Sequence, residues 1–163
     1  HKNDDSWAHG LAGILYALLK AAEILKDEYY IQFAVSRLEN IHADENSSIL
    51  GLCRGKIGLY YAISFVPCDY MTEKLKMLEL YGQEICLTQK ISNVNNLCCG
   101  DAGLRQLAIR YYQKTKEKKY LFAAWHKDIV NINSNIGLLS GMSGIGYALI
   151  HLFYGDEMEL FWK

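Results

Sequence analysis

Asn96-Leu97-Cys98-Cys99-Gly100-Asp101-Ala102-Gly103 is the clearest copy of a motif that this chain repeats. Its glycine pair, Gly-x-x-Gly, occurs four times, at intervals of 45, 45 and 41 residues. The four pairs are Gly10/Gly13, Gly55/Gly58, Gly100/Gly103 and Gly141/Gly144. A period of this length is the signature of a repeat protein, in which successive copies build equivalent structural units. The motif therefore predicts four such units, each with a helix after its glycines.

The residues just before the first glycine of each copy form two columns when the copies are aligned. The first column contains Ala8, Cys53, Cys98 and Leu139, and the second contains His9, Arg54, Cys99 and Ser140. Equivalent positions of a repeat array lie along one edge of it. Three thiols and a histidine are therefore expected at the same rim of the molecule.

The composition is that of a single globular domain. The chain has 163 residues, 51% of them hydrophobic, and a single proline that leaves long helices uninterrupted. A net charge of −1 argues against binding to nucleic acid. No secretory signal is visible. Five cysteines, two of them adjacent, are typical of metal-binding or catalytic thiols in a reducing compartment. We therefore expect a cytoplasmic protein, and peripheral association with a membrane stays open.

The apolar residues follow helical spacing in two patterns. Three runs after glycine pairs are apolar nearly all round and are expected to be buried inner helices: 14–25, 59–65 and 145–153. Three intervening segments carry one apolar stripe and are expected to be half-exposed outer helices: 31–41, 71–85 and 122–132. No stretch alternates like a strand. The predicted fold is all-α, a two-layered ring of helical hairpins. Four hairpins are too few to close such a ring, so we expect a part of a longer protein.

Residues 129–154 have some features of a membrane-spanning helix. Residues 129–154 contain no Lys, Arg, Asp or Glu, and Gly137-x-x-x-Gly141 resembles a transmembrane dimer motif. The segment also contains several Asn and Ser residues and His151, and its sister copies carry charges at comparable positions. We therefore expect no membrane span.

Cys53, Cys98 and Cys99 are the candidate metal ligands. Thiolates favour zinc, and three protein ligands leave the fourth tetrahedral position open, as in catalytic zinc sites. The alternative is that these cysteines are small buried hydrophobic residues, which is the commonest role of a cysteine outside a disulfide. Their recurrence in one column favours the metal. Cys68 and Cys86 lie outside the columns and are expected to be inert packing residues.

His9 and Arg54 are the candidate catalytic residues. His9 shares the column of Cys99, and a neutral imidazole can act as a general acid or base near neutral pH. Arg54 could orient a carbonyl or a carboxylate. Each also has a plainer interpretation, since His9 could hydrogen-bond a loop and Arg54 could form a surface ion pair. The residues alone leave both questions open.

The motifs, taken together and in this order, resemble those of the lanthionine synthetase C-like cyclases. The matching stretches are Trp7–Gly13 (WAHGLAG), Cys53–Gly58 (CRGKIG), Leu97–Gly103 (LCCGDAG) and Gly141–Leu149 (GMSGIGYAL). The last is similar to the C-terminal signature of the class II bifunctional lanthipeptide synthetases. Residues 1–163 are therefore expected to be the C-terminal portion of a cyclase domain, with the rest of the synthetase on the N-terminal side.

The resemblance implies an α/α toroid of seven hairpins, of which this chain would supply roughly the last four, with zinc at its centre. It implies an enzyme that adds a cysteine thiolate of a leader-bearing precursor peptide to dehydroalanine or dehydrobutyrine, forming lanthionine rings in lantibiotic biosynthesis. Cys53, Cys98 and Cys99 match the zinc ligands, and His9 matches the proton donor or acceptor. Arg54 is a candidate to stabilise the enolate oxygen.

This chain departs from the family pattern at two positions and leaves other functions open. Cys99 stands where many relatives have histidine, and Leu52 replaces a tryptophan often seen before the first ligand. The isolated segment is expected to be inactive or incomplete. The alternatives are a related protein that adds glutathione or another small thiol to dehydrated residues, and a non-catalytic helical repeat with structural zinc. A prenyltransferase-type barrel is disfavoured because it normally needs an Asp–Cys–His ligand set.

Overall fold

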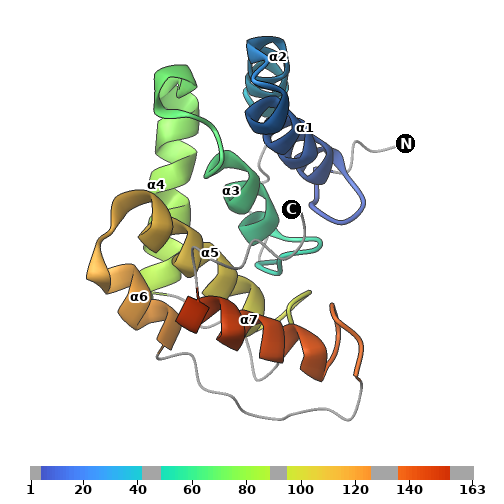
Figure 1. Cartoon of the computed structure of the whole chain (residues 1–163), viewed down its shortest axis with the longest axis vertical. Coiled ribbons are helices and arrows are strands. Elements are labelled where there is room, and N and C mark those ends of the chain that lie inside the picture. The colour runs from blue at the N-terminus through green and yellow to red at the C-terminus, as the bar shows by residue number, and fades with distance from the viewer. Residues whose placement is uncertain (1–4, 42–48, 89–94, 126–135, 155–163) are drawn as a thin grey trace. The chain divides into compact units, whose positions relative to one another are not determined.

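The computed structural model describes residues 5–41, 49–88, 95–125 and 136–154 (Figure 1). Over these ranges the chain forms α-helices and one short 3-10 helix, and no strand. The helices are α1 (Leu11–Leu25), α2 (Glu28–Leu38), α3 (Lys56–Ile63), η1 (Cys68–Tyr70), α4 (Glu73–Thr88), α5 (Asp101–Thr115), α6 (Lys118–Trp125) and α7 (Met142–Tyr154). The all-α prediction is confirmed. None of the described helices combines the length and the apolar character that a bilayer span needs.

The chain divides into two compact units, His1–Gly82 and Gln83–Lys163. In the first unit, α1 packs against both α2 and α3. In the second, α5 packs against both α6 and α7. Each unit therefore contains a helical hairpin together with the following helix that starts at a glycine motif.

The hairpins α1–α2 and α5–α6 reverse direction in the same way. Lys26 ends α1 in the left-handed conformation (φ 53°), and its N–H donates to the carbonyl of Ala22. Lys116 ends α5 in the same conformation (φ 59°), and its N–H donates to Tyr112 at 2.7 Å. A left-handed residue here satisfies a terminal helix carbonyl and turns the chain sharply. The first helix of each hairpin therefore ends in the same backbone conformation, as expected of repeats.

Aromatic rings form the core between α1 and α3. Trp7 lies 4.4 Å from Tyr16 and 5.1 Å from Tyr61, measured between ring centroids. Phe65 extends the cluster, with its ring 4.8 Å from Tyr16 and 5.2 Å from Tyr61. Tilted and edge-to-face rings at these separations are favourable beyond the area they bury. Because Trp7 belongs to the first glycine motif, the cluster attaches that motif to the helix that follows the second one.

The outer helices α2 and α4 bury the predicted stripes. Ala34, Val35 and Leu38 of α2 are buried, as are Leu75 and Leu78 of α4. The apolar stripe predicted for the third outer helix, 122–132, is not buried within α6. The members of this stripe beyond Trp125 lie outside the described residues. The side chains of Phe122 and Trp125 are 60% and 55% exposed. Helix α6 instead buries Tyr120 and Ala124, because the Tyr120 ring packs 5.6 Å from that of Tyr111 on α5.

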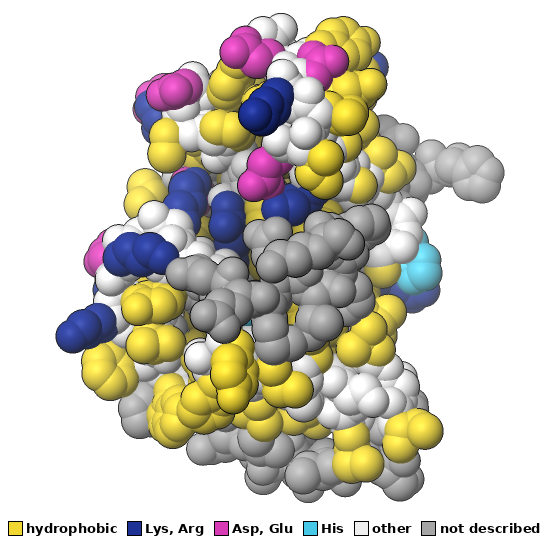
Figure 2. All heavy atoms as spheres, in the orientation of Figure 1, with side chains coloured by type: hydrophobic (Ala, Val, Ile, Leu, Met, Phe, Trp, Pro, Cys, Tyr) yellow, Lys and Arg dark blue, Asp and Glu magenta, His cyan; other side chains and the backbone are white. Residues whose placement is uncertain are grey.

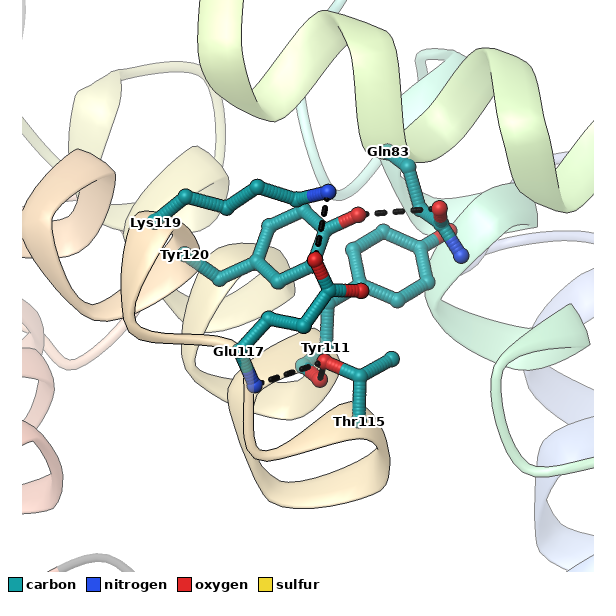
Figure 3. Close-up of polar contacts among 6 residues, drawn as sticks. All are labelled: Gln83, Tyr111, Thr115, Glu117, Lys119 and Tyr120. Carbon is teal, nitrogen blue, oxygen red and sulfur yellow. Dashed lines mark hydrogen bonds and ion pairs between the residues drawn. The ribbon is translucent and has the colours of Figure 1, made fainter.

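A polar cluster attaches α6 to α5 and α4 (Figure 3). The Tyr120 hydroxyl donates to Gln83 Oε1 at 2.9 Å, and Lys119 forms a 2.7 Å ion pair with Glu117. The Glu117 N–H donates to the Thr115 hydroxyl at 3.2 Å. Burial raises the pKa of Tyr120 above its ordinary value near 10. These contacts hold the start of α6 against its neighbours.

The inner helices are less uniform than predicted. Helix α3 is buried along nearly its whole length, as expected. Helices α1 and α7 each leave one apolar side exposed, and hydrophobic side chains reach the surface shown in Figure 2. The exposed residues are Ile14, Ile24 and Leu25 of α1, and Met142, Ile150 and Phe153 of α7. The expectation of all-round burial is therefore wrong for these two helices.

Helix α5 departs from the expectation in a different way, because it is buried but polar. Asp101, Arg105 and Gln106 are all buried on it. The Gln106 Oε1 atom lies 2.6 Å from His151 Nδ1 of α7, and Gln113 Nε2 lies 3.3 Å from His151 Nε2. A neutral imidazole protonated on Nδ1 satisfies both contacts. The α5–α7 interface therefore rests on a hydrogen-bonded network as well as on apolar packing.

Candidate functional site

The four glycine motifs adopt one local structure. Residues 7–9, 52–54, 97–99 and 138–140 each form a turn, and the glycine that follows leads into α1, α3, α5 or α7. The three glycines with measured dihedral angles are alike and extended: Gly10 (φ −133°, ψ −164°), Gly55 (−115°, −176°) and Gly100 (−117°, −172°). The predicted structural equivalence of the four copies is confirmed.

The second glycine of the motif is required because a carbonyl group packs against it. A Cβ atom added there would collide with the carbonyl oxygen of the residue six positions earlier. The collisions are Gly13 with Trp7, Gly58 with Leu52, and Gly144 with Leu138. The motif therefore folds the turn onto the first turn of its own helix, and only glycine permits this approach.

Neighbouring turns are joined by a backbone hydrogen bond at the first column. The N–H of Ala8 donates to the carbonyl of Cys53 at 3.0 Å in the first unit. The N–H of Cys98 donates to the carbonyl of Leu139 at 2.8 Å in the second. Within each unit, residues aligned by the repeat are thus true neighbours in space.

The first unit contains three of the predicted site residues. His9 and Arg54 occupy the same second-column position of two hydrogen-bonded turns, and both side chains are exposed. Cys53, which directly precedes Arg54, is only 3% exposed. An imidazole and a guanidinium that reach solvent from adjacent turns can both contact a ligand, provided that it lies across these turns.

The second unit contains the other two predicted site residues, Cys98 and Cys99. The sulfur atoms of Cys98 and Cys99 lie 3.1 Å apart. Cys99 is exposed and Cys98 half-exposed. Asn96 organises their turn: its Oδ1 accepts a hydrogen bond from the Cys99 N–H at 2.8 Å, and its carbonyl accepts one from the Gly100 N–H at 3.0 Å.

The donor set suits zinc. None of the five cysteines, each of them inside the described ranges, forms a disulfide. Bonds of about 2.3 Å in a tetrahedral zinc site separate two sulfurs by about 3.8 Å, so the Cys98–Cys99 pair needs to open by only about 0.7 Å. Within neither unit do the described residues gather three or more His, Cys, Asp or Glu side chains around one point. Since Cys53 belongs to the other unit, the three-thiol site remains a prediction.

Two further polar residues follow the thiol pair on α5. Asp101 and Arg105 are 1% and 5% exposed. Desolvation lowers the pKa of Arg105, and the negative charge of Asp101 partly opposes this shift. Their i, i+4 spacing is a sequence signal for an ion pair, but burial could not be foreseen from it. The sequence analysis assigns no site role to Asp101, Arg105 or Asn96, although an acidic residue in the first turn of a helix also stabilises the helix dipole. Cys86 is buried, as expected of a packing residue, whereas Cys68 is exposed, so the packing role predicted for Cys68 is wrong.

A protein-family model described as Lanthionine synthetase C-like protein matches residues 1–90. The matched region is more than half of the 163-residue chain and includes the turns that carry His9, Cys53 and Arg54. No curated protein matches the chain.

Proposed function

Since the chain belongs to the lanthionine synthetase C-like family, we propose that it is part of a zinc-dependent cyclase that closes thioether rings in a precursor peptide. The observation that carries the proposal is the Cys98–Cys99 pair, whose sulfurs meet 3.1 Å apart in a turn equivalent to the one that contains Cys53. Members of this family are cyclases that form carbon–sulfur bonds. The fourth motif, Gly141–Leu149, supports the finer assignment to the class II bifunctional synthetases of lantibiotic biosynthesis.

Cys53, Cys98 and Cys99 would hold the zinc ion, which when bound would lower the pKa of a cysteine thiol of the peptide. The proposal requires thiols from both units to bind one ion. Support comes from the repetition of the same turn, and of the same hydrogen bond between turns, in each unit.

The exposed side chains of the first unit would act on the peptide itself. The peptide thiolate forms a bond to the β-carbon of a dehydroalanine or dehydrobutyrine while the π electrons of the double bond move toward the carbonyl, giving an enolate. His9, as an imidazolium, would deliver a proton to the α-carbon. Arg54 would donate hydrogen bonds to the enolate oxygen. The positions of His9 and Arg54 on adjacent turns support this division of roles.

The test combines zinc content with ring closure. The chain, within the longer protein of which it is proposed to be part, is incubated with a synthetic peptide that contains one cysteine and one dehydroalanine, and remaining thiols are alkylated and counted by mass spectrometry. We expect about one zinc per chain and loss of the peptide thiol without a change of mass. His9→Ala should keep its zinc and slow cyclisation by about 10²- to 10⁴-fold, the usual contribution of a general acid.

Cys68→Ser is the matched control, because it removes an exposed thiol outside the motif columns and should change neither zinc content nor rate. Wild-type protein without zinc, or zinc content undiminished in Cys99→Ala, would contradict the metal site. An unchanged rate in His9→Ala would remove His9 from the reaction. A product that gains the mass of added glutathione, with no ring, would identify a small-thiol transferase instead.

A further inference from the structure

The backbone of the thiol pair is held in place by the protein itself. Three consecutive amides in this turn have partners: the Cys98 N–H donates to Leu139, the Cys99 N–H to the Asn96 side chain, and the Gly100 N–H to the Asn96 carbonyl. The distances are 2.8, 2.8 and 3.0 Å. These contacts fix the backbone from which both thiols project.

The Asn96 side chain distinguishes this turn from its sister turns. Ser6 occupies the equivalent position in the first copy, Gly51 in the second and Gly137 in the fourth. The Gly55 N–H donates to the Gly51 carbonyl at 2.8 Å, which reproduces the backbone contact of Asn96. A glycine cannot supply the side-chain acceptor. The second and fourth turns therefore cannot form the side-chain bond that Asn96 makes to the Cys99 amide.

We propose that Asn96 is a positioning residue that preorganises Cys98 and Cys99 as a two-thiol zinc site, which binds the ion before Cys53 joins it. This inference rests on the proposed function for the identity of the ion. Exposed Cys99 gives an ion access from solvent, whereas Cys53 is 3% exposed. On binding, the thiols of Cys98 and Cys99 each form a bond to zinc and release a proton to solvent.

The magnitude of the effect follows from the role of outer residues in metal sites. Partners that orient the ligands of a metal typically change its affinity about 10- to 100-fold when they are removed. Asn96→Ala deletes the acceptor of the Cys99 amide without deleting a ligand. It should therefore weaken zinc binding by about this factor at unchanged stoichiometry. Asn96→Ser keeps an oxygen that can accept from the amide three residues on, and it should restore most of the affinity.

The experiment measures zinc affinity by competition with a chromophoric chelator, and folding of every variant by circular dichroism. Wild type, Asn96→Ala, Asn96→Ser, Cys53→Ser and Cys98→Ser are compared, with Cys68→Ser as control. We expect Cys53→Ser to bind one zinc more weakly than wild type, and Cys98→Ser to lose more affinity than Cys53→Ser. This ordering tests the proposal even if Asn96→Ala fails to fold.

Two results would overturn the inference while leaving the proposed function intact: wild-type affinity in folded Asn96→Ala, or complete loss of zinc in Cys53→Ser with zinc retained in Cys98→Ser. Absence of zinc binding by the wild type would instead refute the proposed function. The affinity measurement needs no substrate, so the two failures are distinguishable.

Discussion

Single side chains give the four equivalent turns their different chemistry. The second-column position holds an imidazole at His9, a guanidinium at Arg54, a thiol at Cys99 and a hydroxyl at Ser140. All four stretches form a turn, and Gly10, Gly55 and Gly100, which follow three of the turns, share one extended conformation. Because the glycines and carbonyls shape the turn, this position can change its side chain without changing the turn.

The single residue Tyr120 should make the stability of the protein depend on pH. Its pKa is raised mainly by burial, so the folded protein keeps the phenol neutral at pH values where the unfolded chain ionises. A raised folded-state pKa gives stability that is fully present below the ordinary value near 10 and is lost as the pH rises through the folded value. The free energy of unfolding should therefore fall above about pH 10.

Urea unfolding of wild type and Tyr120→Phe at about pH 8 and pH 11 checks this expectation. At the lower pH the variant should be about 1 kcal/mol less stable, because it lacks the hydrogen bond to Gln83. Between the two pH values it should lose less stability than wild type, since it cannot ionise. Equal losses in both proteins would exclude Tyr120 as a source of alkaline destabilisation.

At the scale of elements, α1, α3 and α7 each pack their second motif glycine directly against the turn that precedes the helix. In α3 a Cβ atom on Gly58 would overlap the Leu52 carbonyl and lie 2.6 Å from the Cβ of Trp7. Trp7 in turn belongs to the aromatic cluster with Tyr16 and Tyr61. The glycine therefore controls how the first motif packs on the second helix.

Gly58→Ala should lower the free energy of unfolding by about 1–3 kcal/mol, the usual cost of overpacking. Gly146→Ala in α7 is the matched control, because its added Cβ meets no atom within 4 Å. There the better helix propensity of alanine should raise stability by about 0.5–1 kcal/mol. Chemical denaturation of both variants measures the difference. A tolerated alanine at Gly58 would show that the close contact is not required.

At the scale of the whole molecule, the proposed ligands come from two compact units. Cys53 belongs to His1–Gly82, and Cys98 and Cys99 belong to Gln83–Lys163. An ion that binds only the folded protein stabilises it by about 2.7 kcal/mol when its free concentration is 100 times its dissociation constant. An ion shared by all three thiols should give this stabilisation to both units.

Hydrogen–deuterium exchange with zinc and with a chelator tests this expectation. With zinc, the amides around Cys53 and those around Cys98 should both become more protected. In Cys53→Ser only the amides of the second unit should respond. Protection confined to the second unit in the wild type would show that Cys53 is not a ligand.

Much of this architecture could be predicted from local sequence. The glycine period, the helices α2, α3 and α4, and the equivalence of the four turns follow from residue spacing. The burial of α5 agrees with its place after a glycine pair, but its buried polar residues could not be predicted, because polar residues can be buried when they meet partners, as Gln106 meets His151. The buried stripe of α6 was misplaced because Tyr120 packs on Tyr111, a contact between different helices.

The sequence by itself determined the repeat, the helical class and the residues presented at each turn, because glycine spacing and helical periodicity act over a few residues. Only the tertiary structure decided that Asp101 and Arg105 are buried, that the Cys98 N–H donates to the Leu139 carbonyl, and that Gln106 meets His151. These outcomes depend on backbone directions and on packing between helices, which residue spacing does not encode.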